Sequence, residues 1–206
     1  MKTFKIFVAS FLIFFNSCSS AKITYSRKSS VAVRHYNNIM VMALVRHKDK
    51  DMARQMENHL AGDLKRRGYT AVTCSDQFEP GAFDGIKEED AIKKLKSKNI
   101  DAVLTIVLLD KKKELIYIHA NTNSSPGIYS NRFWGYYSRM QSRIYEPGYY
   151  TESTTWFWES NLFDIESKEL LYSVQTKSFN PSSTTKLAHE YGQKIVTDMV
   201  KQQLIR

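Results

Sequence analysis

The sequence lacks the signatures of the common catalytic and metal centres. None of its five histidines pairs with another at metal-ligand spacing on one helix; they stand at positions 35, 47, 59, 119 and 189. His189-Glu190 begins like a zinc-protease motif, but Gln193 occupies the place of its second histidine. A glycine-rich phosphate loop and a nucleophile elbow are also absent from the sequence. We therefore expect a protein that is not an enzyme and holds no metal or cofactor, with a hydrolase built on a dispersed triad as the third hypothesis.

The sequence also lacks an apolar run long enough to cross a bilayer, which requires about 20 apolar residues in a helix. The run Ile6–Phe15 is too short. It follows Lys2 and Lys5 and precedes small residues, which is the arrangement of a secretory signal peptide. These features predict a signal peptide over residues 1–17 and a mature chain without a transmembrane helix.

Residues Phe15-Asn16-Ser17-Cys18 resemble the lipobox of bacterial lipoproteins, in which a small residue precedes the cysteine that receives lipid. Ser17 fits this pattern, whereas Phe15 and Asn16 depart from it in the manner of Bacteroidetes-type lipoboxes. The resemblance implies a palmitate-bearing membrane anchor on Cys18. The alternative is a signal peptide cut elsewhere, which would discard Cys18. Ser19 stands where an Asp would favour the inner membrane, so the resemblance implies the periplasmic face of the outer membrane.

Cysteine is scarce, and this excludes a disulfide framework. Once Cys18 carries lipid, Cys74 has no partner, and we expect it to be a small buried core residue. Removal of residues 1–17, which contain two lysines and no acid, leaves 189 residues with a formal charge of +7, against +9 for all 206 residues. The basic residues are spread along the chain, which favours solvated faces and helix ends. Export makes nucleic acid the least expected partner.

Hydrophobic periodicity predicts a polar tether over 18–37 and a single domain over 38–206. Gly68 is expected to end the first helix in a left-handed conformation. The predicted fold class is α/β (α+β), with a mixed sheet, helices packed on it and the order βαβαββββα. The expected elements are strands at 39–45, 69–74, 102–109, 114–119, 154–163 and 170–176, a turn at 110–113, helices at 52–64 and from 88, and a last helix opened by Pro181.

An apolar first strand, a Tyr/Gly-rich insert and a hairpin over Leu162–Tyr172 follow one another in this chain. This order resembles the periplasmic α/β domain shared by the TolB amino-terminal domain, CsgG and LpoB. It also resembles outer-membrane lipoproteins of unknown function that are built on a related plan. The resemblance covers roughly residues 38–205 and brings no catalytic residue with it.

The insert at 120–152 is the segment most suited to binding. A long irregular segment in a compact domain is often functional, and Tyr, Trp and Arg are enriched at binding hot spots. Three interpretations stay open: a lid that packs over the sheet, a protein-binding surface, and a site for a glycan or a lipid headgroup. The candidate binding residues are Tyr129, Arg132, Phe133, Trp134, Tyr136, Tyr137, Arg139, Arg143, Tyr149 and Tyr150.

Together these features favour a lipid-anchored, non-catalytic protein of the cell envelope. We expect it to bind another envelope protein as an accessory or assembly factor. The alternative is a glycan-binding module for peptidoglycan or an acidic polysaccharide, whose binding would weaken as salt rises because exposed charges are screened.

Overall fold

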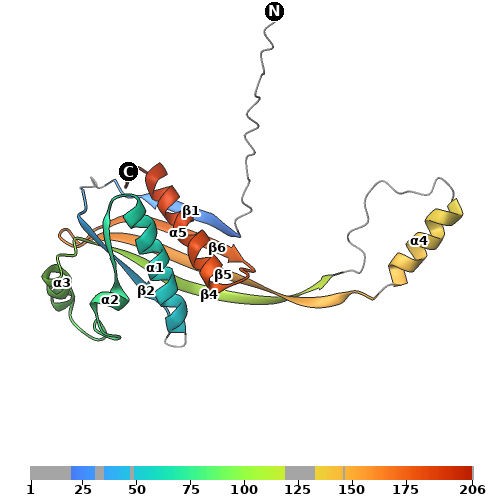
Figure 1. The fold of residues 1–206 in the computed structure, drawn as a ribbon, viewed down its shortest axis with the longest axis horizontal. Helices are drawn as coiled ribbons and strands as arrows, with labels where there is room; N and C mark the ends of the chain where they lie inside the picture. The colour runs from blue at the N-terminus through green and yellow to red at the C-terminus, as the bar shows by residue number, and fades with distance from the viewer. Residues whose placement is uncertain (1–19, 31–34, 47–48, 119–132, 146, 206) are drawn as a thin grey trace, which may run out of the picture.

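The computed structural model describes residues 20–30, 35–46, 49–118, 133–145 and 147–205. Six strands form one mixed sheet in the order β1-β6-β5-β4-β2-β3 (Figure 1). Strands β3, β2 and β4 are parallel, and β4, β5, β6 and β1 are antiparallel. The predicted mixed α/β class is therefore confirmed. The strands are β1 (Ala21–Lys28), β2 (Asn38–Leu44), β3 (Thr70–Thr73), β4 (Ala102–Ile118), β5 (Tyr149–Asp164) and β6 (Leu170–Phe179).

Two long helices, α1 and α5, lie side by side across one face of the sheet (Figure 1). The opposite face is covered at its β2 end by α3 and the loop before it, which enclose a second, smaller apolar cluster. No helix among the described residues is both long and apolar enough to cross a membrane. The helices are α1 (Lys50–Arg66), α2 (Cys74–Gln77), α3 (Glu88–Ser97), α4 (Phe133–Tyr145) and α5 (Thr184–Lys201).

The main core lies between the sheet and the pair α1 and α5. The inner face predicted for the first helix is confirmed, because Met52, Met56, Leu60 and Leu64 are all buried. Trp158 of β5 is fully buried beneath α5. Gly68 follows α1 with a φ of 87°, a left-handed conformation that favours glycine, so the predicted helix end is also confirmed.

The tether expected over 18–37 is wrong at Ala21–Lys28, which forms the edge strand β1. This strand pairs antiparallel with β6 and buries Ala21. An irregularity in the register between Ile23 and Tyr25 breaks the two-residue alternation, and this explains why the sequence pattern did not reveal a strand.

The turn expected at 110–113 and the separate strand at 114–119 are also wrong. Strand β4 runs through this region as one element of 17 residues, with a bulge between Leu108 and Asp110. The lysines at 111–113 pair with Thr154–Trp156 of β5, where solvent reaches their side chains. Cys74, expected in a strand, instead begins the short helix α2 and is half-buried.

Candidate functional site

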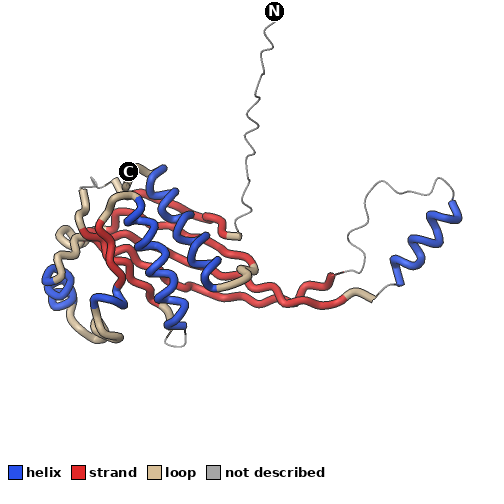
Figure 2. Tube along the Cα trace, viewed as in Figure 1, coloured by secondary structure: helices blue, strands red, loops and turns tan. Residues whose placement is uncertain are grey.

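A two-stranded arm extends from the sheet and carries most of the described candidate residues. The last pair between β5 and β6 joins Thr155 to Phe179. Beyond that pair β5 continues with β4 alone, and we call residues Lys113–Ile118 and Tyr149–Thr154 the arm. The arm projects away from the body of the domain, and α4 lies past its end (Figures 1 and 2).

Cross-strand side-chain contacts hold the arm together. An isolated pair of strands is only marginally stable in water, so such contacts matter. The ammonium of Lys113 lies 2.9 Å from the Glu152 carboxylate, and the rings of Tyr117 and Tyr150 pack with centroids 5.0 Å apart. At the root, the Lys111 ammonium sits 3.8 Å from the centre of the Trp156 ring.

Gly148 closes the far end of the arm because only glycine leaves room there. Its backbone N–H donates to the Tyr117 hydroxyl at 2.9 Å. A Cβ at this position would lie 2.3 Å from the carbonyl oxygen of Ile118 and 2.5 Å from the Tyr117 ring. The approach of two backbones and one ring thus fixes where β5 begins.

Helix α4 presents aromatic side chains to solvent. The exposed fraction is 74% for Phe133, 71% for Trp134, 47% for Tyr136 and 43% for Tyr137. Residues three and four apart share a helix face, and the Trp134 and Phe133 rings lie 5.5 Å and 6.0 Å from the Tyr137 ring. The sequence of α4 contains two arginines and no acid. A helix was not predicted inside the insert, so the irregular conformation expected there is wrong at Phe133–Tyr145.

The structure places six candidate residues on the arm and α4: four aromatic residues on α4, and Tyr149 and Tyr150 on the arm. Their exposure contradicts the interpretation of the described part of the insert as a lid over the sheet. Arg139 and Arg143 lie within α4, whereas Tyr129, Arg132 and the lipidation candidate Cys18 lie outside the described residues. Three exposed residues that the sequence did not single out join the arm, and the β4 pattern of apolar side chains could have shown them: Leu115, Ile116 and Tyr117.

A buried carboxylate lies at the carboxyl ends of two of the parallel strands. The Glu57 side chain of α1 is 4% exposed, and accepts hydrogen bonds from the backbone N–H groups of Ala43 at 2.8 Å and Ser75 at 3.0 Å. Because ligands of α/β sheets commonly bind at this edge, an internal carboxylate already uses two backbone donors that an anionic ligand could otherwise meet there.

Cys74 lies beside this carboxylate and is a weak nucleophile. Burial, and secondarily the nearby Glu57 charge, raise the pKa of the Cys74 thiol to about 12. The thiolate is the reactive form of cysteine, so the side chain is inert at neutral pH.

Two buried hydroxyl contacts join α5 to the sheet. The Tyr172 hydroxyl donates to the Asp198 carboxylate at 2.7 Å, and the Ser160 and Tyr191 hydroxyls lie 2.6 Å apart. Burial raises the pKa of both tyrosines, which keeps them protonated. These contacts fasten layers of the fold, since each pairs an element of the sheet with α5.

A shallow cavity of about 250 Å³ lies at the root of the arm, and no titratable side chain lines it. It therefore offers no nucleophile and base in contact. Within the described ranges, no cluster of three or more His, Cys, Asp or Glu side chains could hold a metal ion. The residues lining the cavity are Met52, Thr154, Trp156, Asn180, Pro181, Ser183, Thr184 and Leu187.

Comparisons with known proteins identify no family, because no family model and no curated protein matches the chain. Among solved structures, the PelC dodecamer from Paraburkholderia phytofirmans is similar, with 11% identity over 82% of this chain and 89% of that chain and a TM-score of 0.45. Lipoprotein GNA1162 from Neisseria meningitidis shows 16% identity over 80% and 98%, with a TM-score of 0.43. A putative neuraminyllactose-binding hemagglutinin homolog from Helicobacter pylori shows 10% over 87% and 94%, with a TM-score of 0.43. Likenesses this distant carry no argument about what the present chain does.

Proposed function

We propose that this chain is a lipid-anchored, non-catalytic protein of the bacterial cell envelope. In this proposal lipid on Cys18 holds it at the periplasmic face of the outer membrane, and it acts as an accessory or assembly factor by binding another envelope protein. The contact surface is the arm together with α4. The observation that carries the proposal is the exposure of Phe133 and Trp134, at 74% and 71%, on a helix held away from the core.

Three physical arguments support a binding role for this surface. Large exposed aromatic side chains gain much apolar burial when a partner covers them, and they lose little rotamer freedom. The arm gives them a fixed base through the Lys113–Glu152 ion pair and the Tyr117–Tyr150 packing. A membrane anchor raises the effective concentration of the surface near membrane partners.

In-cell crosslinking tests the contact surface. The protein is recovered through a carboxy-terminal tag, and the triple variant Phe133→Ala, Trp134→Ala, Tyr137→Ala is compared with the matched control Tyr25→Ala. Tyr25 is 47% exposed but lies on β1, outside the arm. We expect a specific envelope protein that is captured by the natural chain and the control and lost from the triple variant. Equal capture by all three would rule out α4 as part of the contact surface.

The anchor is tested separately. Metabolic labelling with palmitate should mark the natural protein and leave Cys18→Ser unlabelled, and fractionation should place the natural protein in the outer membrane. Labelling that survives in Cys18→Ser would refute the assigned anchor.

A further inference from the structure

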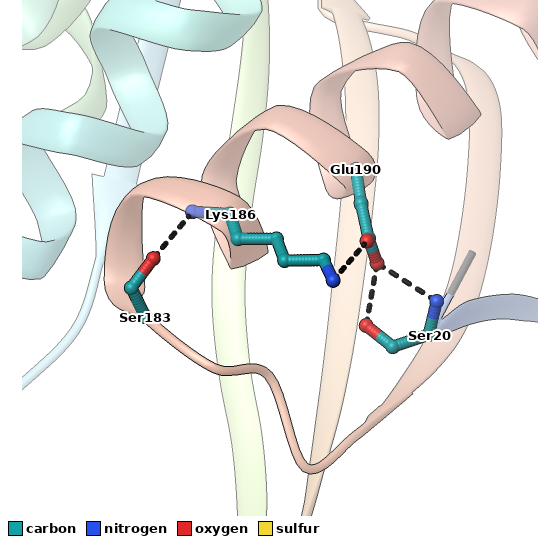
Figure 3. A network of polar contacts seen from close by, with 4 residues as sticks. All are labelled: Ser20, Ser183, Lys186 and Glu190. Atoms are coloured by element: carbon teal, nitrogen blue, oxygen red, sulfur yellow. Dashed lines mark hydrogen bonds and ion pairs between the residues drawn. The ribbon is translucent and has the colours of Figure 1, made fainter. Parts of the chain in front are cut away.

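The folded domain begins almost at the proposed lipid attachment site. The Ser20 carbonyl accepts a hydrogen bond from the Phe179 backbone N–H at 3.0 Å, and the Ser20 N–H and hydroxyl donate to the Glu190 carboxylate at 2.8 Å and 2.5 Å (Figure 3). Only two residue steps separate Ser20 from Cys18. An extended chain spans at most about 3.6 Å per residue, so the attachment point lies within about 7 Å of Ser20.

The arm projects from the same end of the sheet at which Ser20 is held. Ser20 is level with Phe179, and Phe179 pairs with Thr155, the residue at which the arm leaves the sheet. From Thr155 the arm continues for six residues to Tyr149. At about 3.4 Å per residue this is about 20 Å, roughly three times the reach of the chain between Ser20 and the lipid.

The chemistry of the arm changes along its length. Its root is charged, with Lys113 paired to Glu152. Its far half is apolar and aromatic, and the exposed fractions of Ile116, Tyr149 and Tyr150 are 43%, 63% and 69%.

Helix α4, past the end of the arm, suits a lipid interface in both its aromatic and its basic residues. Trp and Tyr concentrate at the boundary between headgroups and hydrocarbon, where the ring is apolar and the N–H or O–H is wet. A helix that carries aromatic side chains and arginines without acids is attracted to anionic lipid surfaces. Helix α4 exposes Trp134 and Tyr137 and contains no acidic residue.

We propose that the far half of the arm and α4 insert their aromatic side chains into the interface of the same bilayer leaflet that holds the lipid on Cys18. The inference rests on the proposed anchor and adds a second point of membrane attachment. Two points fix the orientation of the domain, which a single flexible acyl link does not. The partner of the proposed function then binds the part of the arm and α4 that stays outside the lipid.

Quenching of Trp134 fluorescence tests this proposal in the lipidated, full-length mature protein. The protein is reconstituted in vesicles of phosphatidylethanolamine with a minority of phosphatidylglycerol, with and without brominated acyl chains, which quench only rings that lie among lipids. Trp134→Phe is the matched control, because Trp158 is fully buried and Trp156 packs at the root of the arm. We expect brominated lipid to quench an emission component that is absent from Trp134→Phe, and aqueous iodide to lose access to Trp134 once vesicles are present.

Two results would overturn the proposal. Trp134 that stays open to iodide and unaffected by brominated lipid lies in water. Trp134 shielded from both quenchers lies against protein, which would assign α4 to a partner or to a second copy of this chain.

A second measurement keeps the membrane contact separate from the anchor. The Cys18→Ser protein should still sediment with anionic vesicles, and adding Phe133→Ala, Trp134→Ala and Tyr137→Ala should abolish this sedimentation without changing the circular dichroism spectrum. Lipid quenching without a crosslinked partner would refute the partner alone. A captured partner with Trp134 in water would refute the membrane contact alone.

Discussion

The Glu57 carboxylate makes a specific energetic prediction. It is 4% exposed, and it joins α1 to the end of β2 and the start of α2 through the N–H groups of Ala43 and Ser75. In Glu57→Gln one of these donors faces an amide NH₂ in place of an acceptor, and a buried unsatisfied donor costs about 1–3 kcal/mol. In Glu57→Ala both donors lose their acceptor, so the free energy of unfolding should fall by about 2–6 kcal/mol.

Chemical denaturation of the Cys18→Ser background measures this effect, with thermal melts as a second readout. For a domain of this size, each kcal/mol lowers Tm by roughly 2–4 °C, so a loss of about 3 kcal/mol corresponds to roughly 6–12 °C. The control is Glu88→Gln, because Glu88 is 67% exposed and forms a surface ion pair with Lys168, and such pairs contribute at most about 1 kcal/mol. If the free energy of unfolding of Glu57→Gln lies within about 0.5 kcal/mol of that of the natural domain, the two hydrogen bonds do not stabilise the contact of α1 with β2 and α2, and the reasoning fails.

Three further predictions concern the arm, the helix pair and the thiol. Gly148→Ala should push the Tyr117 ring aside and speed amide hydrogen exchange in the arm while leaving the denaturation midpoint of the domain unchanged; unaltered exchange would contradict the close contact seen there. Gly192→Ala gains about 1 kcal/mol of helix propensity but sets a Cβ 2.5 Å from the Asp63 carboxylate, and since overpacking costs about 1–3 kcal/mol we expect a net loss in denaturation experiments that Asp63→Ala reverses. Because burial raises its pKa to about 12, Cys74 should react with iodoacetamide at pH 7–8 far more slowly in the folded protein than after unfolding, and equal rates would show that the thiol is neither buried nor protonated.

The sequence pattern predicted the elements that pack regularly on the core. The buried spacing of Met52, Met56 and Leu60 identified α1, and the apolar run at Ile39 identified β2. The edge strand β1 escaped detection because its register irregularity interrupts the alternation and its outward positions are polar. Local pattern therefore succeeded where an element packs regularly on the core and failed where a bulge interrupts the pattern.

The candidate site shows the same division. The concentration of aromatic residues singled out a segment whose described part extends from the sheet, but the organisation of these residues depends on long-range pairing. The sequence of the lysines at 111–113 alone favours a turn. Pairing with Thr154–Trp156 instead keeps them in strand β4, where the arm begins. The helical spacing of Phe133 and Tyr137 was a usable signal for α4 that the abundance of Tyr and Gly obscured.

Strand β1 also decides when folding can finish. It is synthesised near the beginning of the chain, whereas its partner β6 comes almost at the end. Ala21 therefore cannot pair with Ser178 until nearly the whole chain has been made. The sheet edge cannot close while the carboxy-terminal part is still being made or threaded through a translocation channel. If the chain is exported as proposed, this topology delays closure of the sheet until export is nearly complete. Strand β1, beside the proposed anchor, is then the last strand to join the sheet.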